Sequence, residues 1–216
     1  MDSASGTAVS TDPRFFAHIF SRAATGLGMV TYEQDFLAKQ YESCAALREL
    51  PGAAKSWLSA MASAAEAQNV TLQYCMSLSR HLLQSVSFPR VTHARASHDY
   101  GQSRADDTEQ WSSIGLTAIL YWAVGVLPFK DDFWSATVQP GNHYGALEAD
   151  PELQTLVSAL TAGPVGPSDA IGRLNRTRVI QAMPPRRHSA QAARPRHEPG
   201  LYIRSGSTKL HGPGRA

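Results

Sequence analysis

Short runs rich in β-branched and aromatic residues alternate with helix-forming segments, and this alternation constrains the fold more than any other feature of the chain. Strands are predicted at residues 29–36, 70–76, 91–96, 125–130 and 164–168. Helices are predicted, from helical spacing or from a cap residue followed by proline, at residues 13–24, 51–65, 81–86, 108–124 and 150–162. Alternating strands and helices are typical of a parallel sheet with helical crossovers, so the sequence predicts the α/β class.

Polar residues gather at the carboxyl ends of the predicted strands. They are Asp35, Cys75, Ser97–Asp99, Asp131–Asp132 and Ser168–Asp169. A (β/α)8 barrel builds its active site at this end of its strands. A doubly wound sheet places its ligand groups there too, so the placement alone does not choose between the two architectures. No glycine-rich phosphate loop follows any predicted strand, which disfavours a nucleotide-binding version.

Charge divides the chain of 216 residues into two parts. Residues 184–216 hold seven Arg or Lys against one Glu, whereas residues 1–183 hold 13 basic against 17 acidic side chains. The Arg-, Pro- and Gly-rich segment 183–216 and the polar segment 1–12 are predicted to be disordered, and 13–182 to form the folded part. An acidic folded part argues against a nucleic-acid-binding surface, because phosphate binding needs clustered cations.

Other sequence signals narrow the class of protein. Cys44 and Cys75 are isolated from each other in sequence, so buried thiols are predicted rather than a disulfide framework or a zinc site. The N-terminus lacks the basic and apolar regions of a secretory signal. The most apolar segment, 114–129, is shorter than the ~20 residues that cross a bilayer. These features predict no membrane partner and favour the cytoplasm as the default location.

Two carboxylates at different strand ends can face each other across a cleft. Retaining glycosidases need such a pair about 5 Å apart, and Asp35 with Asp99 is the pair that the strand positions favour. Glu33 shares the strand face of Asp35 but lies one step deeper, where a carboxylate more often orients its neighbours. The alternative for each aspartate is a cap on the helix that follows its strand.

Four segments, in order, resemble motifs of the raffinose synthase and alkaline α-galactosidase family, whose barrels are related to melibiase-type α-galactosidases. Val91-Thr-His-Ala-Arg-Ala-Ser-His-Asp-Tyr100 is similar to the family's Arg-Ala-Ser-Asp-Asp-Phe, and Gln73-Tyr-Cys-Met76 to its Ser-Cys-Met strand. Pro128-Phe-Lys-Asp-Asp-Phe-Trp134 is similar to its Gln-Pro-Asp-Trp-Asp-Met-Phe, and residues 161–172 to its Ser-Gly-Gly-Pro-Ile-Tyr-Val-Ser-Asp strand. The resemblance covers about residues 13–182.

The resemblance implies roles for particular residues. The strand that carries Glu33 and Asp35 corresponds to the family's nucleophile strand; both qualify, and Asp35 is preferred because it lies nearer the cleft. Asp99 corresponds to the second of the two aspartates from which the acid/base comes. The resemblance also implies that five residues of the matched segments bind the substrate: Asp132, Trp134, Arg95, His98 and Asp169. It implies a carbohydrate substrate and no metal or organic cofactor.

The resemblance begins before what would be the fourth barrel strand, so we expect a partial (β/α)8 barrel of about the last five strand–helix units. Two functions follow as expectations. The first is a retaining glycoside hydrolase or galactosyl transferase acting on α-galactosides, in which Asp35 attacks the sugar and Asp99 handles the proton. The second is a catalytically inactive carbohydrate-binding or interaction protein, favoured by the partial barrel and by His98 at the position of the family's first aspartate.

Overall fold

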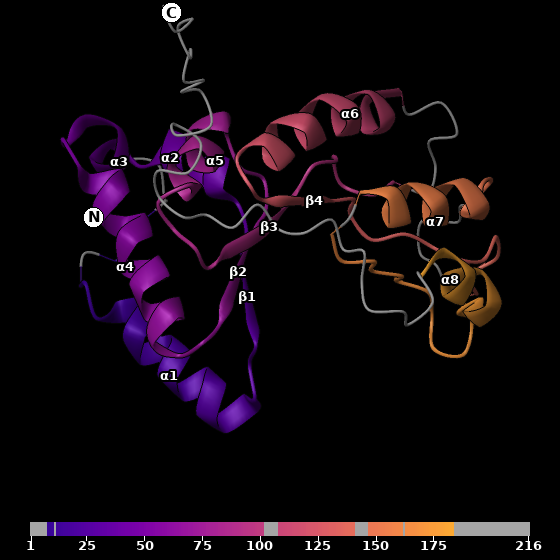
Figure 1. Ribbon diagram of the computed structural model, residues 1–216, viewed down its shortest axis with the longest axis horizontal. Coiled ribbons are helices and arrows are strands. Elements are labelled where there is room, and N and C mark those ends of the chain that lie inside the picture. The colour runs from indigo at the N-terminus through magenta and orange to yellow at the C-terminus, as the bar shows by residue number, and fades with distance from the viewer. Residues whose placement is uncertain (1–7, 11, 102–107, 141–146, 162, 184–216) are drawn as a thin grey trace, which may run out of the picture.

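The computed structural model describes residues 8–10, 12–101, 108–140, 147–161 and 163–183, and the fold is given for these residues (Figure 1). Residues 184–216 of the tail that is predicted to be disordered lie outside this range, as do 1–7 and 11 of the predicted N-terminal segment. The boundaries of the folded part therefore stay predictions.

The described residues form strands and helices in alternation, as the sequence predicts. The strands are β1 (Thr31–Gln34), β2 (Thr71–Tyr74), β3 (Val91–Arg95) and β4 (Leu127–Phe129). The helices are α1 (Phe15–Leu27), α2 (Leu37–Ser43), α3 (Ala45–Glu49), α4 (Ala53–Ala67), α5 (Ser79–Ser85), α6 (Thr108–Ala123), α7 (Pro151–Leu160) and α8 (Arg176–Ala182).

The four strands form one parallel sheet in the order β1-β2-β3-β4. This confirms the α/β class, and it confirms that the first four predicted strands lie parallel in sequential order. At least one helix connects each strand to the next, which is how parallel neighbours are joined. The carboxyl ends of β1 to β4 consequently lie along one edge of the sheet.

Side chains alternate between the two faces of the sheet, and one of these faces is polar. Leu72 and Tyr74 of β2 are buried in the core, so Gln73 between them lies on the opposite face. The pairing register places Glu33 beside Gln73, and Gln73 beside His93. His93 Nε2 lies 2.7 Å from Gln73 Oε1, which ties β3 to β2 on this polar face.

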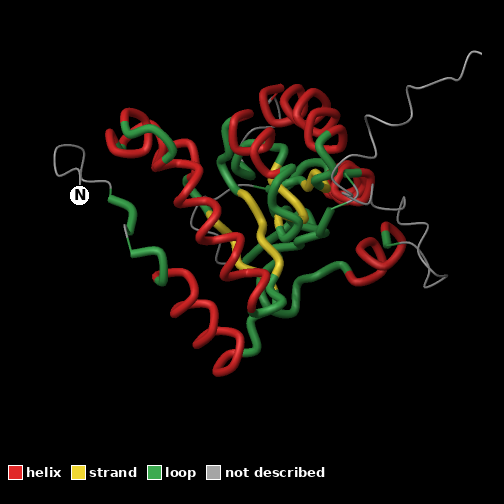
Figure 2. Tube along the Cα trace, turned by 60° about the vertical axis from the view of Figure 1, so that its left-hand side comes forward, coloured by secondary structure: helices red, strands yellow, loops and turns green. Residues whose placement is uncertain are grey.

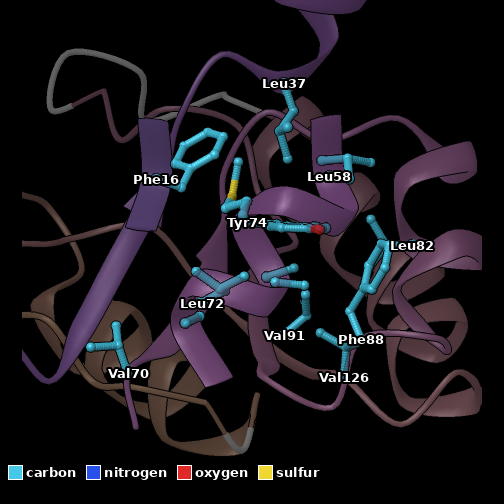
Figure 3. Close-up of a cluster of buried hydrophobic side chains, with 14 of the residues drawn as sticks. Phe16, Leu37, Leu58, Val70, Leu72, Tyr74, Leu82, Phe88, Val91 and Val126 are labelled. Atoms are coloured by element: carbon cyan, nitrogen blue, oxygen red, sulfur yellow. The ribbon is translucent and has the colours of Figure 1, made fainter. Parts of the chain in front are cut away.

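The core lies between the other face and the helices. Helices α1, α4, α5 and α6 contribute to one buried cluster together with β2 and β3, through residues such as Phe20, Leu58, Leu82 and Tyr121. Figure 3 shows apolar side chains of this cluster, among them Leu58 and Leu82, gathered around Leu72 and Tyr74. In Figure 2 the strands lie in the middle of the fold with helices on their outside, and α1 packs along α4.

The predicted fifth strand, 164–168, forms only an isolated parallel bridge between Pro167 and Phe133, a residue beyond the end of β4. Phe133 N–H donates to Gly166 O at 3.3 Å, and Ser168 N–H donates to Phe133 O at 2.8 Å. Pro164 and Pro167 have no N–H to give, which limits the ladder that this segment can form. The segment thus takes the predicted direction next to the chain after β4, but it is not a full strand.

Three short helices are absent from the sequence prediction. Helices α2 and α3 have seven and five residues, too few to show a helical period, and α8 has seven. A signal for α8 does exist: Asn175 caps the helix by accepting a hydrogen bond from Arg178 N–H at 3.1 Å.

Cys44 and Cys75 are both buried and free, as the sequence predicts. In the described part of the chain, no helix is long and apolar enough to cross a membrane.

Candidate functional site

A second polar row lies two residues beyond the first, at the carboxyl edge of the sheet. Continuing the register one step past Gln34 and Tyr74 places Asp35 beside Cys75, and Cys75 beside Arg95. The backbone supports this alignment, because Cys75 N–H donates to Gln34 O at 3.0 Å. On its other side Arg95 is paired with Phe129, the last residue of β4.

Arg95 forms the centre of this edge. Its side chain is 10% exposed, and its guanidinium pairs with two carboxylates: Nη2 with Asp99 Oδ1 at 2.6 Å and Nη1 with Asp131 Oδ1 at 3.4 Å. Burial alone would lower the pKa of Arg95, but its neighbours, among them the carboxylates of Asp131 and Asp99, raise it on balance. Arg95 therefore stays a cation paired with two carboxylates, while its buried Nε has no hydrogen-bond partner among the described residues.

Cys75 connects Asp35 to this centre. Burial, and then the neighbouring Asp35 carboxylate, raise the pKa of the Cys75 thiol, so that it remains protonated. The charge of Arg95 acts on the same thiol. Asp35 is half-buried, and one of its oxygens also accepts a hydrogen bond from Phe36 N–H at 2.6 Å. Cys75 therefore lies between Asp35 and Arg95, the residue that pairs with Asp99.

Asp131 connects the segment after β3 to the chain after β4 through hydrogen bonds. Its N–H donates to Ser97 Oγ at 2.9 Å, and its Oδ2 accepts from Tyr100 N–H at 2.7 Å. Ala96 N–H donates to Phe129 O at 2.9 Å just before these contacts. The segment that carries Asp99 is therefore held at both ends, while the Asp99 side chain itself is 66% exposed.

Lys130 is buried under this edge with 1% of its surface exposed. Its Nζ donates to the backbone oxygens of Asp131 at 3.2 Å and of Asp132 at 3.0 Å. The ammonium lies 4.9 Å from the ring centre of Tyr100 and 5.4 Å from that of Phe133. Burial lowers the pKa of Lys130 to about 8, although nearby carboxylates oppose the change. Lys130 thus stabilises the turn that carries Asp131 and Asp132.

Aromatic residues and a buried glutamate complete this support. The Tyr100 hydroxyl donates a short hydrogen bond to Glu148, which is itself buried. Burial and that hydrogen bond raise the pKa of Tyr100. Trp134 is 6% exposed and meets the Tyr100 ring edge-on, with 6.3 Å between ring centres. The indole of Trp134 therefore forms part of the packing beneath the site.

Asp132 follows Asp131 and is exposed. Partial loss of hydration raises the pKa of its carboxyl; a hydrogen bond from Ser168 opposes this, and the charge of Asp131 adds to it. The positive charges of Lys130 and Arg95 act in the opposite direction and lower the pKa of the Asp132 carboxyl. Asp132 therefore lies at the same edge as Asp35 and Asp99, just after β4, which is the strand farthest from β1.

Asp169 serves a neighbouring loop. Its oxygens accept from the N–H and hydroxyl of Ser135, from Ala136 N–H, and from Gln139 Nε2 at 2.6 Å. Gln139 Oε1 in turn accepts from Ala170 N–H at 2.8 Å. These contacts join the chain after β4 to the segment before α8, and they account for both oxygens of Asp169.

Two further predicted residues are exposed. Glu33 lies on the polar face of β1, and its charge acts on Cys75. The His98 side chain is exposed, while its backbone oxygen accepts from Ser97 Oγ at 2.9 Å. The structure therefore brings Arg95 and Asp99 into contact and places Asp35 on the same edge, on the other side of Cys75, with Glu33, Asp132 and His98 at the margins. Trp134 lies beneath this edge, and Asp169 belongs to another loop.

Sequence reasoning did not assign site roles to Asp131, Lys130, Tyr100 or Glu148. The sequence does contain a signal for Lys130 and Asp131, because these two residues of opposite charge directly follow the run that forms β4. Among the described residues, no group of three His, Cys, Asp or Glu side chains could hold a metal ion.

Neither a comparison with protein-family models nor a search of the curated proteins found a match for this chain. The case for a function therefore depends on the geometry of the carboxyl edge.

Proposed function

We propose that this chain carries the carboxylate site of a retaining glycosidase acting on α-galactosides, or of a galactosyl transferase that shares its first step. The scaffold we propose is about the last five strand–helix units of a (β/α)8 barrel. A doubly wound sheet reverses its strand order at a switch point, whereas β1 to β4 follow in sequence without reversal. The polar rows on the face opposite the core also suit the inside of a barrel whose outside is covered by helices.

The observation that carries the proposal is the row of side chains that runs from Asp35 to Asp99 along the carboxyl edge. Continuing the register past Gln34 and Tyr74 places Asp35 beside Cys75 and Cys75 beside Arg95, and Arg95 pairs with Asp99 at 2.6 Å. One carboxylate after β1 and one after β3 thus lie on the same edge of the sheet. A retaining mechanism needs two carboxyl groups that reach the same glycosidic bond from opposite sides.

In the proposed reaction, an oxygen of Asp35 attacks the anomeric carbon and forms a glycosyl ester, while the bond to the leaving oxygen breaks. Asp99 gives that leaving oxygen its proton. Asp99 then takes a proton from water, or from an acceptor hydroxyl, whose oxygen attacks the anomeric carbon and releases Asp35. Asp132 is placed to accept hydrogen bonds from sugar hydroxyls at the same edge.

A specific contact favours the second candidate, a carbohydrate-binding protein without turnover. In its ion pair with Arg95, Asp99 carries a negative charge, whereas a proton donor must carry a proton. His98, beside it, occupies the position of the first of the family's two aspartates. A cleft with these features can still bind sugar hydroxyls through Asp35 and Asp132.

Hydrolysis of an aryl α-galactoside tests the proposal. We expect Asp35→Ala to lower kcat by several orders of magnitude, because the covalent step is lost. Azide should partly rescue Asp99→Ala on a substrate with a good leaving group, since azide attacks the glycosyl ester without base assistance. Glu33→Gln should cost less than Asp35→Ala, and the reverse order would assign the nucleophile to Glu33.

The binding protein is distinguished in the same experiment. If the chain binds galactosides without hydrolysing them, the second candidate is correct, and His98→Asp becomes the informative change because it recreates paired aspartates. Turnover gained by His98→Asp would assign the proton donor to position 98. If the chain neither binds nor hydrolyses galactosides, both candidates are wrong.

A further inference from the structure

Asp131 lies where the end of β4 meets the segment that carries Asp99. It makes three contacts with that region: its N–H with Ser97 Oγ, its Oδ2 with Tyr100 N–H, and its Oδ1 with Arg95 Nη1. Its side chain is mostly buried. One residue thus touches both ends of the Ser97–Tyr100 segment and also the cation that pairs with Asp99.

We propose that Asp131 is a positioning residue of the site: it fixes the Ser97–Tyr100 segment and shares the Arg95 guanidinium with Asp99. The inference rests on the proposed function in one respect, the role of Asp99 as the acid/base. Asp131 itself has both oxygens engaged with protein groups and acts through Arg95 and the backbone rather than on the sugar.

The shared cation gives Asp131 an influence on the direction of Arg95. Arg95 Nη1 pairs with Asp131 and Arg95 Nη2 pairs with Asp99, so the first ion pair orients the planar guanidinium that the second one uses. Removing the Asp131 carboxylate would leave the guanidinium held by Asp99 alone, and Asp99 would lose a fixed partner.

Exchange of the Tyr100 amide hydrogen tests the positioning role without any activity. The Tyr100 N–H is held by Asp131 Oδ2 at 2.7 Å. In Asp131→Ala we expect its exchange to accelerate about tenfold or more, and in Asp131→Asn, whose side-chain oxygen can still accept, to stay close to the wild-type rate. Glu66→Gln is the control, because Glu66 pairs with Arg90 away from this edge.

Two outcomes of the exchange experiment decide the structural part. Fast exchange in Asp131→Ala with a circular dichroism spectrum like that of the wild type supports the proposal, and unchanged exchange overturns it. If Asp131→Ala does not fold, Asp131→Asn decides: exchange close to the wild-type rate supports the proposal, and exchange as fast as in an unstructured segment overturns it.

The kinetics of hydrolysis test the part that concerns Arg95. We expect Asp131→Ala to lower kcat about tenfold or more with little change in KM, and Asp131→Asn, whose side-chain oxygen can still accept from Tyr100 N–H, to recover most of this loss. An unchanged kcat in Asp131→Ala overturns this part. If the wild type hydrolyses no galactoside, the proposed function fails, and the exchange measurement still decides the positioning role.

Discussion

His81 of α5 should make the stability of the fold depend on pH. Its Nδ1 accepts a hydrogen bond from Leu78 N–H at 3.0 Å, so this ring nitrogen carries no proton in the folded chain. The side chain is 2% exposed and meets the Tyr41 ring edge-on. The Arg80 guanidinium lies 3.9 Å from the centre of the same Tyr41 ring, which brings a positive charge close to His81.

Burial, and then the charge of Arg80, lower the pKa of His81 from 6.5 to about 4. Between these values the unfolded chain binds a proton that the folded chain does not, so the free energy of unfolding falls as the pH falls. The contribution is fully present above pH 6.5 and is lost as the pH approaches 4. At 1.36 kcal/mol for each pH unit, the loss is about 3 kcal/mol.

Urea unfolding followed by circular dichroism at pH 7 and pH 4.5 measures this effect in the wild type and in His81→Asn, which keeps an acceptor near the position of Nδ1. We expect the free energy of unfolding of His81→Asn to fall by about 2 to 3 kcal/mol less than that of the wild type between the two pH values. His18→Gln, which changes an exposed histidine, is the control and should behave as the wild type. A difference between wild type and His81→Asn below about 1 kcal/mol would refute this reasoning.

Two further predictions concern the packing around β4. A methyl group at Gly163 would lie 2.5 Å from Pro128 O and 2.6 Å from Phe129 Cβ, so Gly163→Ala should lower the free energy of unfolding by about 2 to 3 kcal/mol in urea titrations. Gly166→Ala, where the space is open, should change it little; equal effects of the two changes would contradict the close approach. Lys130, whose pKa is lowered to about 8, should contribute stability that grows as the pH rises from 8 towards 10.5, because the unfolded lysine still binds the proton that the buried one has released. Cys75 and Tyr100, whose pKa values are raised by burial, act in the opposite direction in both proteins, so the test is the difference between the wild type and Lys130→Met. We expect this difference in the free energy of unfolding to change by about 3 kcal/mol in favour of the wild type over that range, and a constant difference would show that the ammonium is not buried in solution.

Much of the fold could be predicted because it depends on local patterns. The runs around Thr31–Gln34 and Val91–Arg95 have the β-branched and aromatic composition of strands, and the segments between them have helical spacing. Consecutive strands joined by helices leave few topologies, which is why parallel order followed from the alternation. The fifth strand was overpredicted because its prolines weaken a ladder without changing the apolar pattern of the segment.

The contacts of the site depend on register and loop geometry, which no local pattern encodes. In β3 one extra residue, Thr92, separates the partners of Leu72 and Gln73, and this places His93 rather than Thr92 beside Gln73. The hydrogen bonds of Asp169 with residues 135–139 likewise join positions that lie 30 to 34 residues apart in the sequence. The sequence could therefore place the carboxylates at the correct edge, but it could not show which of them are engaged by protein groups.

Covalent trapping identifies the nucleophile directly. The chain is incubated with a galactosyl fluoride whose ring carries a second fluorine, which slows breakdown of a glycosyl ester, and intact mass spectrometry followed by peptide mapping locates any adduct. We expect one fluorogalactosyl group on Asp35 in the wild type and none in Asp35→Ala. An adduct on another residue, or hydrolysis of the reagent with no adduct at any time point, would contradict the assignment of Asp35 as the nucleophile.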